Sequence, residues 1–143
     1  MRTPEDIGES IKKVEQAEQA ANTMDQAIRE MGPRLKEALT MRNVSPADIN
    51  SAMRGFYRTA DIERKSELYK MNAKFWKEVK LLLHILEREW GAWEYDEVEG
   101  EVLFDSDNAI IEFNNTMERI DNLATNIEEL QLAILRKQAG EEN

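Results

Sequence analysis

The 143-residue sequence has no cysteine, one histidine, three prolines and six glycines. Without cysteine the chain forms no disulfide and no thiolate metal site, a composition that fits a reducing compartment. Few prolines and glycines also mean few helix breakers, and 34% of the residues are charged. This combination favours long helices with solvated faces over a β-sheet, and the length suits one domain with its own core.

Long apolar runs are missing as well. The longest, at residues 81–86, is interrupted by His84 and is far too short to cross a bilayer. Residues 1–10 contain no apolar stretch and no cleavage-like site, so we expect no secretion signal. The sequence therefore predicts a cytoplasmic protein that does not contact a membrane.

The single histidine, His84, restricts catalytic and metal chemistry. A carboxylate-bridged di-iron bundle needs a Glu-x-x-His motif on each of two helices, and a zinc triad or a Cys–His dyad needs ligands that this sequence lacks. The acid-rich segment 94–107 does not match a calcium-binding loop, because the third position counted from Asp96 is Val98. We therefore expect no catalytic residue, no cofactor, no metal site and no enzymatic activity.

The segment 61–93 is predicted to form a central helix. Its apolar residues recur at three- and four-residue spacing, as on one face of a helix. They are Tyr69, Trp76, Val79, Leu83, Leu86, Trp90 and Trp93, with Asn72 on the same stripe and Leu68, Phe75 and Leu82 beside it. So broad a face needs neighbours on more than one side, and its aromatic residues are interpreted as core rather than as a ligand platform.

An N-terminal helix is predicted over residues 1–31. Thr3 and Pro4 are typical of a helix start. Two interleaved sets at seven-residue spacing give the a and d positions of about three heptads. They are Ile7, Val14, Ala21 and Ile28 in one set, and Ala17, Met24 and Met31 in the other. Gly32 and Pro33 are predicted to end this helix, with glycine as its C-terminal cap.

Residues 33–59 are predicted to form a corner of two short helices joined by a four-residue turn. Whether residues 46–93 form one helix or two stays open. The corner belongs to the only basic region, since residues 32–60 carry five bases and two acids. Its outline is that of a helix-turn-helix in which Arg42, Arg54 and Arg58 face a DNA groove. The overall net charge of −10 disfavours binding to nucleic acid.

Residues 94–107 carry seven acids and no base: Glu94, Asp96, Glu97, Glu99, Glu101, Asp105 and Asp107. The segment is predicted to be a small hairpin that turns near Gly100 or, equally, a solvated loop that is anchored by Tyr95, Leu103 and Phe104. A patch of this charge is a candidate site for a basic partner.

The C-terminal helix is predicted over residues 108–138 and carries the clearest heptad pattern of the chain. Its stripe consists of Ile110, Phe113, Met117, Ile120, Ala124, Ile127 and Ile134. The summed apolar faces of the helices exceed what one small bundle needs. We therefore expect a homo-oligomer, with a dimer favoured, and this stripe as its interface.

Together these segments predict a single all-α domain over residues 1–143, a helical bundle in which the long central and C-terminal helices form an antiparallel hairpin beside the N-terminal helix. The leading functional hypothesis is a non-enzymatic protein–protein interaction module, such as an adaptor, assembly factor or inhibitor, acting through helical faces and the acidic loop. Proteins of this type are common among phage and mobile-element products. The alternatives are an acidic nucleic-acid mimic and a DNA-binding regulator that uses the basic corner.

Overall fold

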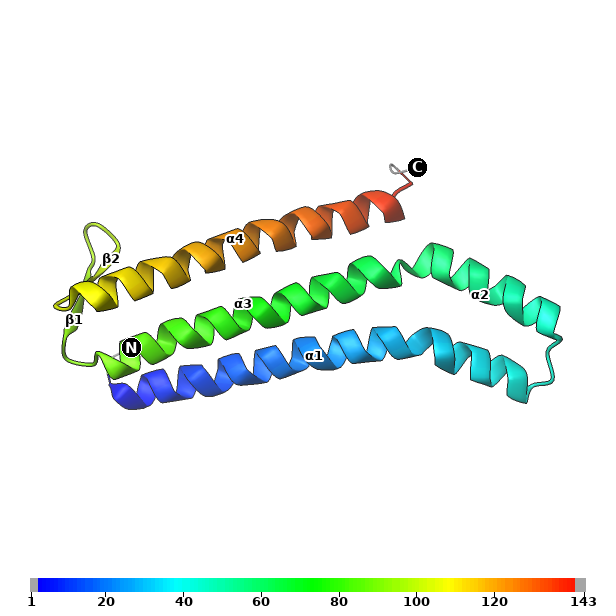
Figure 1. Ribbon diagram of the computed structural model, residues 1–143, viewed down its shortest axis with the longest axis horizontal. Helices are drawn as coiled ribbons and strands as arrows, with labels where there is room; N and C mark the ends of the chain where they lie inside the picture. The colour runs from blue at the N-terminus through cyan, green and yellow to red at the C-terminus, as the bar shows by residue number, and fades with distance from the viewer. Residues whose placement is uncertain (1–2, 141–143) are drawn as a thin grey trace.

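The computed structural model describes residues 3–140, and it is all-α except for one small hairpin. The elements in chain order are α1 (Pro4–Met41), α2 (Pro46–Ala60), α3 (Ile62–Arg88), β1 (Trp93–Asp96), β2 (Glu101–Phe104) and α4 (Asp107–Gln138). The predicted helical bundle with long antiparallel helices is confirmed. The N-terminal and C-terminal helices extend along the two sides of α3, which lies in the middle (Figure 1).

The main helix contacts are those of α1 with α3 and of α3 with α4. The three long helices therefore form an open layer rather than a closed triangle, with neighbouring helices running in opposite directions (Figure 1). α2 lies at the far end of the layer and packs against the last part of α1.

The predicted end of the first helix at Gly32 and Pro33 is wrong, because α1 continues through both residues to Met41. Gly32 is buried, and a Cβ atom there would lie 2.1 Å from the hydroxyl oxygen of Tyr57 on α2. The glycine thus leaves room for a tyrosine ring from a second helix and does not act as a C-terminal cap. Pro33 stands inside the helix, where its ring and missing N–H favour a bend, and α1 bends in this part (Figure 1).

The question left open above is answered by two helices, α2 and α3. The predicted end of the central helix at residue 93 is wrong, because α3 ends at Arg88 and Trp93 begins β1. Asp61 separates α2 from α3 and adopts the left-handed conformation, with φ 52°. Aspartate tolerates this conformation better than most residues. One oxygen of its side chain lies 3.3 Å from Nζ of Lys137, so the end of α4 is tied to this junction.

The largest buried cluster lies at the end of the layer that carries the hairpin. It combines residues of α1, α3, β2 and α4: Ile7, Ile11, Val14, Leu83, Ile85, Leu86, Phe104 and Ala109. Trp93, Val102 and Phe113 pack around it. The hairpin is therefore anchored in the core of the helical layer through one of its faces.

Candidate functional site

The acidic segment is a two-stranded antiparallel hairpin. Trp93 pairs with Phe104, Glu94 with Leu103, Tyr95 with Val102 and Asp96 with Glu101. Gly100 closes the turn with φ 68°, a value that glycine adopts without strain. Of the two structures that the sequence allowed for this segment, a loop or a small hairpin, the molecule adopts the hairpin.

Side chains alternate between the two faces of a strand, and this alternation separates apolar from acidic residues here. One face carries Trp93, Tyr95, Val102 and Phe104, and it turns toward the core. The other face, which we call the acidic face, carries Glu94, Asp96, Glu101 and Leu103. Glu97 and Glu99 lie in the exposed turn between the strands. The hairpin thus presents five carboxylates and one leucine outward.

Two residues predicted to anchor the segment are exposed instead. Tyr95 is 57% exposed and Leu103 is 43% exposed, whereas Phe104 is buried as expected. The sequence gives a signal for this, because a turn at Gly100 places Leu103 in the same strand face as Glu101. Leu103 is therefore an apolar member of the acidic face that the composition alone did not identify.

Asp96 also has a local structural role. Its Oδ1 accepts the backbone N–H of Val98 at 2.9 Å and that of Glu99 at 3.3 Å. An aspartate that bonds the backbone in this way stabilises a turn. It also stands directly opposite Glu101 across the ladder, where two like charges destabilise the pairing by up to about 1 kcal/mol.

Asp105 and Asp107 belong to the start of α4 rather than to the hairpin. Ser106 caps this helix by accepting the backbone N–H of Ala109 at 3.3 Å. Asp107 lies in the first helical turn, where a negative charge interacts favourably with the helix dipole. Within residues 3–140 no ion pair involves any of the seven acids of residues 94–107.

The hairpin is held in place by contacts to α3 and α4. Nε1 of Trp93 donates to the carbonyl oxygen of Leu86 at 2.9 Å and so satisfies a carbonyl at the end of α3. The rings of Phe104 and Phe113 lie 5.1 Å apart, centre to centre. The backbone N–H of Asp105 donates to the carbonyl oxygen of Ala92 at 2.9 Å. These contacts fix the acidic face relative to the helices.

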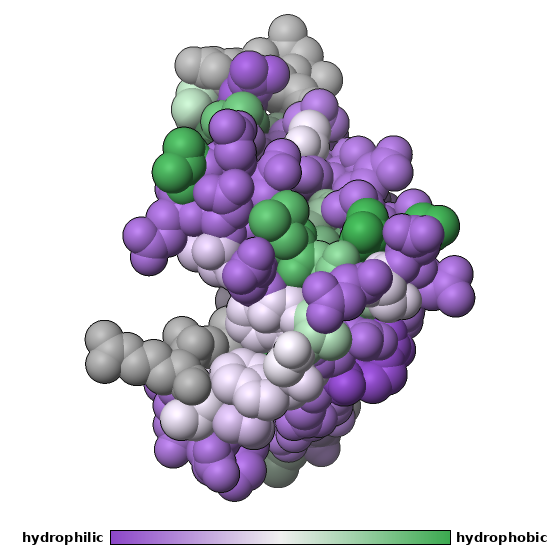
Figure 2. All heavy atoms as spheres, turned by 90° about the vertical axis from the view of Figure 1, so that its left-hand side faces the viewer, coloured by the Kyte–Doolittle hydropathy of each residue, from purple (hydrophilic) through white to green (hydrophobic). Residues whose placement is uncertain are grey.

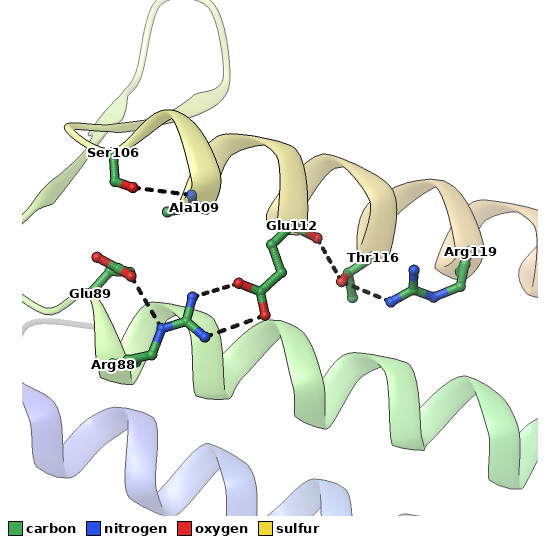
Figure 3. A network of polar contacts seen from close by, with 7 residues as sticks. All are labelled: Arg88, Glu89, Ser106, Ala109, Glu112, Thr116 and Arg119. Carbon is green, nitrogen blue, oxygen red and sulfur yellow. Dashed lines mark hydrogen bonds and ion pairs between the residues drawn. The ribbon is translucent and has the colours of Figure 1, made fainter.

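A polar network braces the two helices that flank the hairpin (Figure 3). The guanidinium of Arg88 on α3 donates to both carboxylate oxygens of Glu112 on α4, at 2.6 and 3.3 Å, and also to Glu89. These bonds raise the pKa of Arg88 above its ordinary value and lower the pKa of Glu112. Thr116 donates to the carbonyl oxygen of Glu112 at 2.8 Å and accepts from Arg119.

The end of the molecule that carries the hairpin is mostly hydrophilic, with separate small hydrophobic patches (Figure 2). A groove of about 470 Å³ lies between β2 and the first half of α4. Leu103, Ile110 and Met117 contribute apolar groups to it, and Glu101 and Asn114 contribute polar groups. This end therefore offers carboxylates beside an apolar groove.

The three arginines of the predicted DNA-facing corner are exposed but serve different local contacts. Arg42 caps the C-terminus of α1, and Arg54 donates to the hydroxyl of Ser51 at 3.4 Å. Arg58 lines a small cavity beside Lys137. The predicted pair of short helices is also wrong, because the first is the end of the 38-residue α1. α1 and α2 run side by side in opposite directions around the connection 42–45 (Figure 1).

Burial varies along the predicted interface stripe of the C-terminal helix, and Met117 and Ile127 are half-buried. Ile120 and Ile134 are buried within the chain, and Phe113 packs against Phe104. Ile110 and Ala124 are exposed. Part of the stripe is thus filled by the chain itself, and the assignment of the stripe as an oligomer interface stays a prediction.

His84 is exposed, with its Nδ1 3.6 Å from a carboxylate oxygen of Glu87. Among residues 3–140 no group of three or more His, Asp or Glu side chains is arranged to hold a metal ion. No helix in this part of the chain combines the length and the apolar character needed to span a membrane.

Comparisons of the chain with models of known families, with curated proteins and with solved structures give no match.

Proposed function

We propose that this chain is a non-enzymatic protein-binding module whose acidic hairpin docks on a basic surface of another protein. The observation that carries the proposal is the acidic face: Glu94, Asp96 and Glu101 point outward from a braced hairpin without an ion pair in the described chain. Glu97 and Glu99 extend the same charge to the exposed turn.

Three further features support a binding role over a merely solvating one. The acids are placed on a hairpin anchored by Trp93 and Phe104, so little conformational entropy is lost when a partner binds. The facing carboxylates of Asp96 and Glu101 repel each other, and a cation from a partner would relieve this repulsion. Leu103 and the adjoining groove supply apolar area for the centre of an interface.

Charge complementarity of this kind mainly increases the association rate and the salt dependence of binding. A partner that normally binds nucleic acid is the sharpest form of the hypothesis, because carboxylates on a rigid element imitate phosphates. In that form the chain acts as a decoy, and nucleic acid competes with it for the partner.

The test compares two variants of equal net charge. The hairpin variant carries Glu94→Gln, Glu97→Gln, Glu99→Gln and Glu101→Gln, and it keeps Asp96 because that side chain closes the turn. The control variant carries four changes at exposed helical positions: Glu15→Gln, Glu118→Gln, Glu128→Gln and Glu129→Gln. Both variants and the wild-type chain are used to capture partners from cells that encode the chain, with quantitative mass spectrometry.

We expect a protein that the wild-type chain and the control variant capture and that the hairpin variant does not capture. This protein should dissociate as the salt concentration is raised. Equal capture by all three chains would contradict the proposal. If added nucleic acid displaces the captured protein, the decoy form is supported; if it does not, an ordinary protein–protein contact is.

A further inference from the structure

The three-helix layer has one polar face. Two grooves on this face are lined by charged residues of neighbouring helices. One groove brings Arg29 of α1 beside Glu67 and Lys70 of α3. The other brings Lys74 and Lys77 of α3 beside residues of α4, including Arg119 and Asn126.

Apolar side chains gather on the opposite side of the layer. On α1, Met24 and Met31 lie on the flank away from Arg29, and each is 47% exposed. On α3, Asn72, Phe75 and Val79 follow one another at three- and four-residue spacing on the side away from Lys74, and all are half-buried. On α4, Met117 lies on the flank away from Arg119. We call these six residues, Met24, Met31, Asn72, Phe75, Val79 and Met117, the apolar face.

The hairpin covers one end of this side of the layer. Val102 and Phe104 pack there with Leu83 and Leu86 of α3, which are 6% and 5% exposed. Farther along α3, away from the hairpin, Asn72, Phe75 and Val79 are half-buried, and the elements described within residues 3–140 include no second hairpin that covers them. Seen from the hairpin end, the outline of the molecule is indented on one side rather than round (Figure 2).

The solvent-accessible surface area of the whole chain is consistent with a face that nothing covers. The chain exposes 10065 Å² at a mass of 16.6 kDa. A compact monomer of this mass exposes about 7,600 Å² by the usual scaling of surface with mass, so the excess is about 2,500 Å². If a dimer covers half of this excess area on each chain, its interface buries about 2,500 Å² in total. This area is within the range of obligate homodimers.

We propose that the apolar face binds the apolar face of a second copy of this chain, in an antiparallel arrangement. A two-fold axis brings the same patch of both chains together. The charge distribution fixes the direction. Residues 94–109 carry seven acids and no base, and residues 32–60 carry five bases and two acids. These segments lie at opposite ends of the layer (Figure 1), so antiparallel copies place the acidic end of each beside the basic end of the other.

The test uses a matched pair of substitutions on opposite faces. Met24 on the apolar face and Leu81 on the polar face are each 47% exposed, so neither change disturbs the core of a single chain. We expect sedimentation equilibrium to give the mass of two chains for the wild type at tens of micromolar. Met24→Glu should raise the dissociation constant about hundredfold or more, because it buries a charge in the interface, whereas Leu81→Glu should leave it unchanged.

A monomeric wild type would overturn the proposal, and so would equal dissociation of the two variants. Because the chain has no cysteine, Met24→Cys and Leu81→Cys allow a second measurement. The thiol at position 24 should react more slowly with a labelling reagent as the concentration rises, and the thiol at position 81 should not. The reverse order would place the second copy on the polar face.

The direction is tested by carbodiimide coupling of amines to carboxylates. Lys36 lies near the far end of α1, so within one chain it cannot reach the hairpin (Figure 1). Links from Lys36 to Glu97 or Glu99 in the purified dimer would support the antiparallel arrangement. The antiparallel arrangement would be overturned by a dimer in which Lys36 is linked only to carboxylates at its own end of the layer and never to the hairpin. These measurements use the purified chain alone, so their outcome is separate from the test of the proposed acidic-face partner.

Discussion

Gly32 of α1 and Tyr57 of α2 approach so closely that a Cβ atom at position 32 would lie 2.1 Å from the tyrosine hydroxyl oxygen and 2.7 Å from Cζ of its ring. The two residues are 25 positions apart along the chain and join α1 to α2, at the place where α1 continues past its expected end. Tyr57 is 50% exposed, so its ring has room to move aside when the space at Gly32 is filled.

This contact predicts a coupling between the two positions. In a Tyr57→Ala background, Gly32→Ala should stabilise the chain by about 1 kcal/mol, because alanine is favoured over glycine inside a helix. With Tyr57 present the same change should stabilise less or destabilise, since the ring is displaced. Urea unfolding of the four chains of this double-mutant cycle at one concentration measures the difference. Equal effects of Gly32→Ala in both backgrounds would mean that the ring does not rest on Gly32.

The same contact explains why the sequence misplaced the end of α1. Gly-Pro after a helical stretch is the usual stop signal, and the reason for this glycine lies on another helix. A non-local contact leaves no trace in local periodicity. The fold class, the four-residue connection after Met41 and the start of α4 near residue 108 were predictable, because they depend on local spacing and capping.

Hydrophobic periodicity also misassigned one side of α1. Ile7, Val14 and Ala21 are buried as predicted. The second set of buried positions on α1 consists of Ile11, Asp25 and Gly32, and not of the predicted Ala17, Met24 and Met31. A pattern based on apolar residues selects methionines over an aspartate. The structure buries Asp25 because Ser66 on α3 supplies a hydrogen bond, and this partner is 41 positions away.

The buried Asp25–Ser66 pair gives the second prediction. Asp25 is 5% exposed, accepts the hydroxyl proton of Ser66 and forms an ion pair with Arg29 at 3.0 Å. Ser66→Ala leaves a buried carboxylate oxygen without this donor, and should lower the free energy of unfolding by about 1–3 kcal/mol. Ser51→Ala, at an exposed serine of α2, is the control and should change it by less than about 0.5 kcal/mol. Similar losses in both variants would show that the Asp25 contact adds nothing.

The Arg88–Glu112 pair predicts a pH dependence. Arg88 lowers the pKa of Glu112 below its ordinary value of 4.5. The pair therefore contributes stability above that pH, and the contribution is lost as the pH falls through the lower pKa of the folded chain. Both side chains are about half exposed, so salt should weaken the effect. NMR titration should show a higher pKa of Glu112 in Arg88→Gln than in the wild type.

Arg136→Gln is the control for that titration, because it removes a positive charge from the other end of α4. It should leave the pKa of Glu112 as in the wild type. A pKa of Glu112 that is the same in all three chains would contradict the ion pair in solution.

The left-handed conformation of Asp61 gives the last prediction. At this position glycine should be more stable than alanine, which is the reverse of the order in a helix. Asp61→Gly and Asp61→Ala both remove the carboxylate and its contact with Lys137, so they differ only in backbone preference. At φ 52° glycine is not strained, whereas alanine loses about 1 kcal/mol. The glycine variant should therefore be the more stable of the two by about 1 kcal/mol in thermal or urea unfolding. If α2 and α3 were instead one continuous helix in solution, alanine would be the more stable by a similar amount.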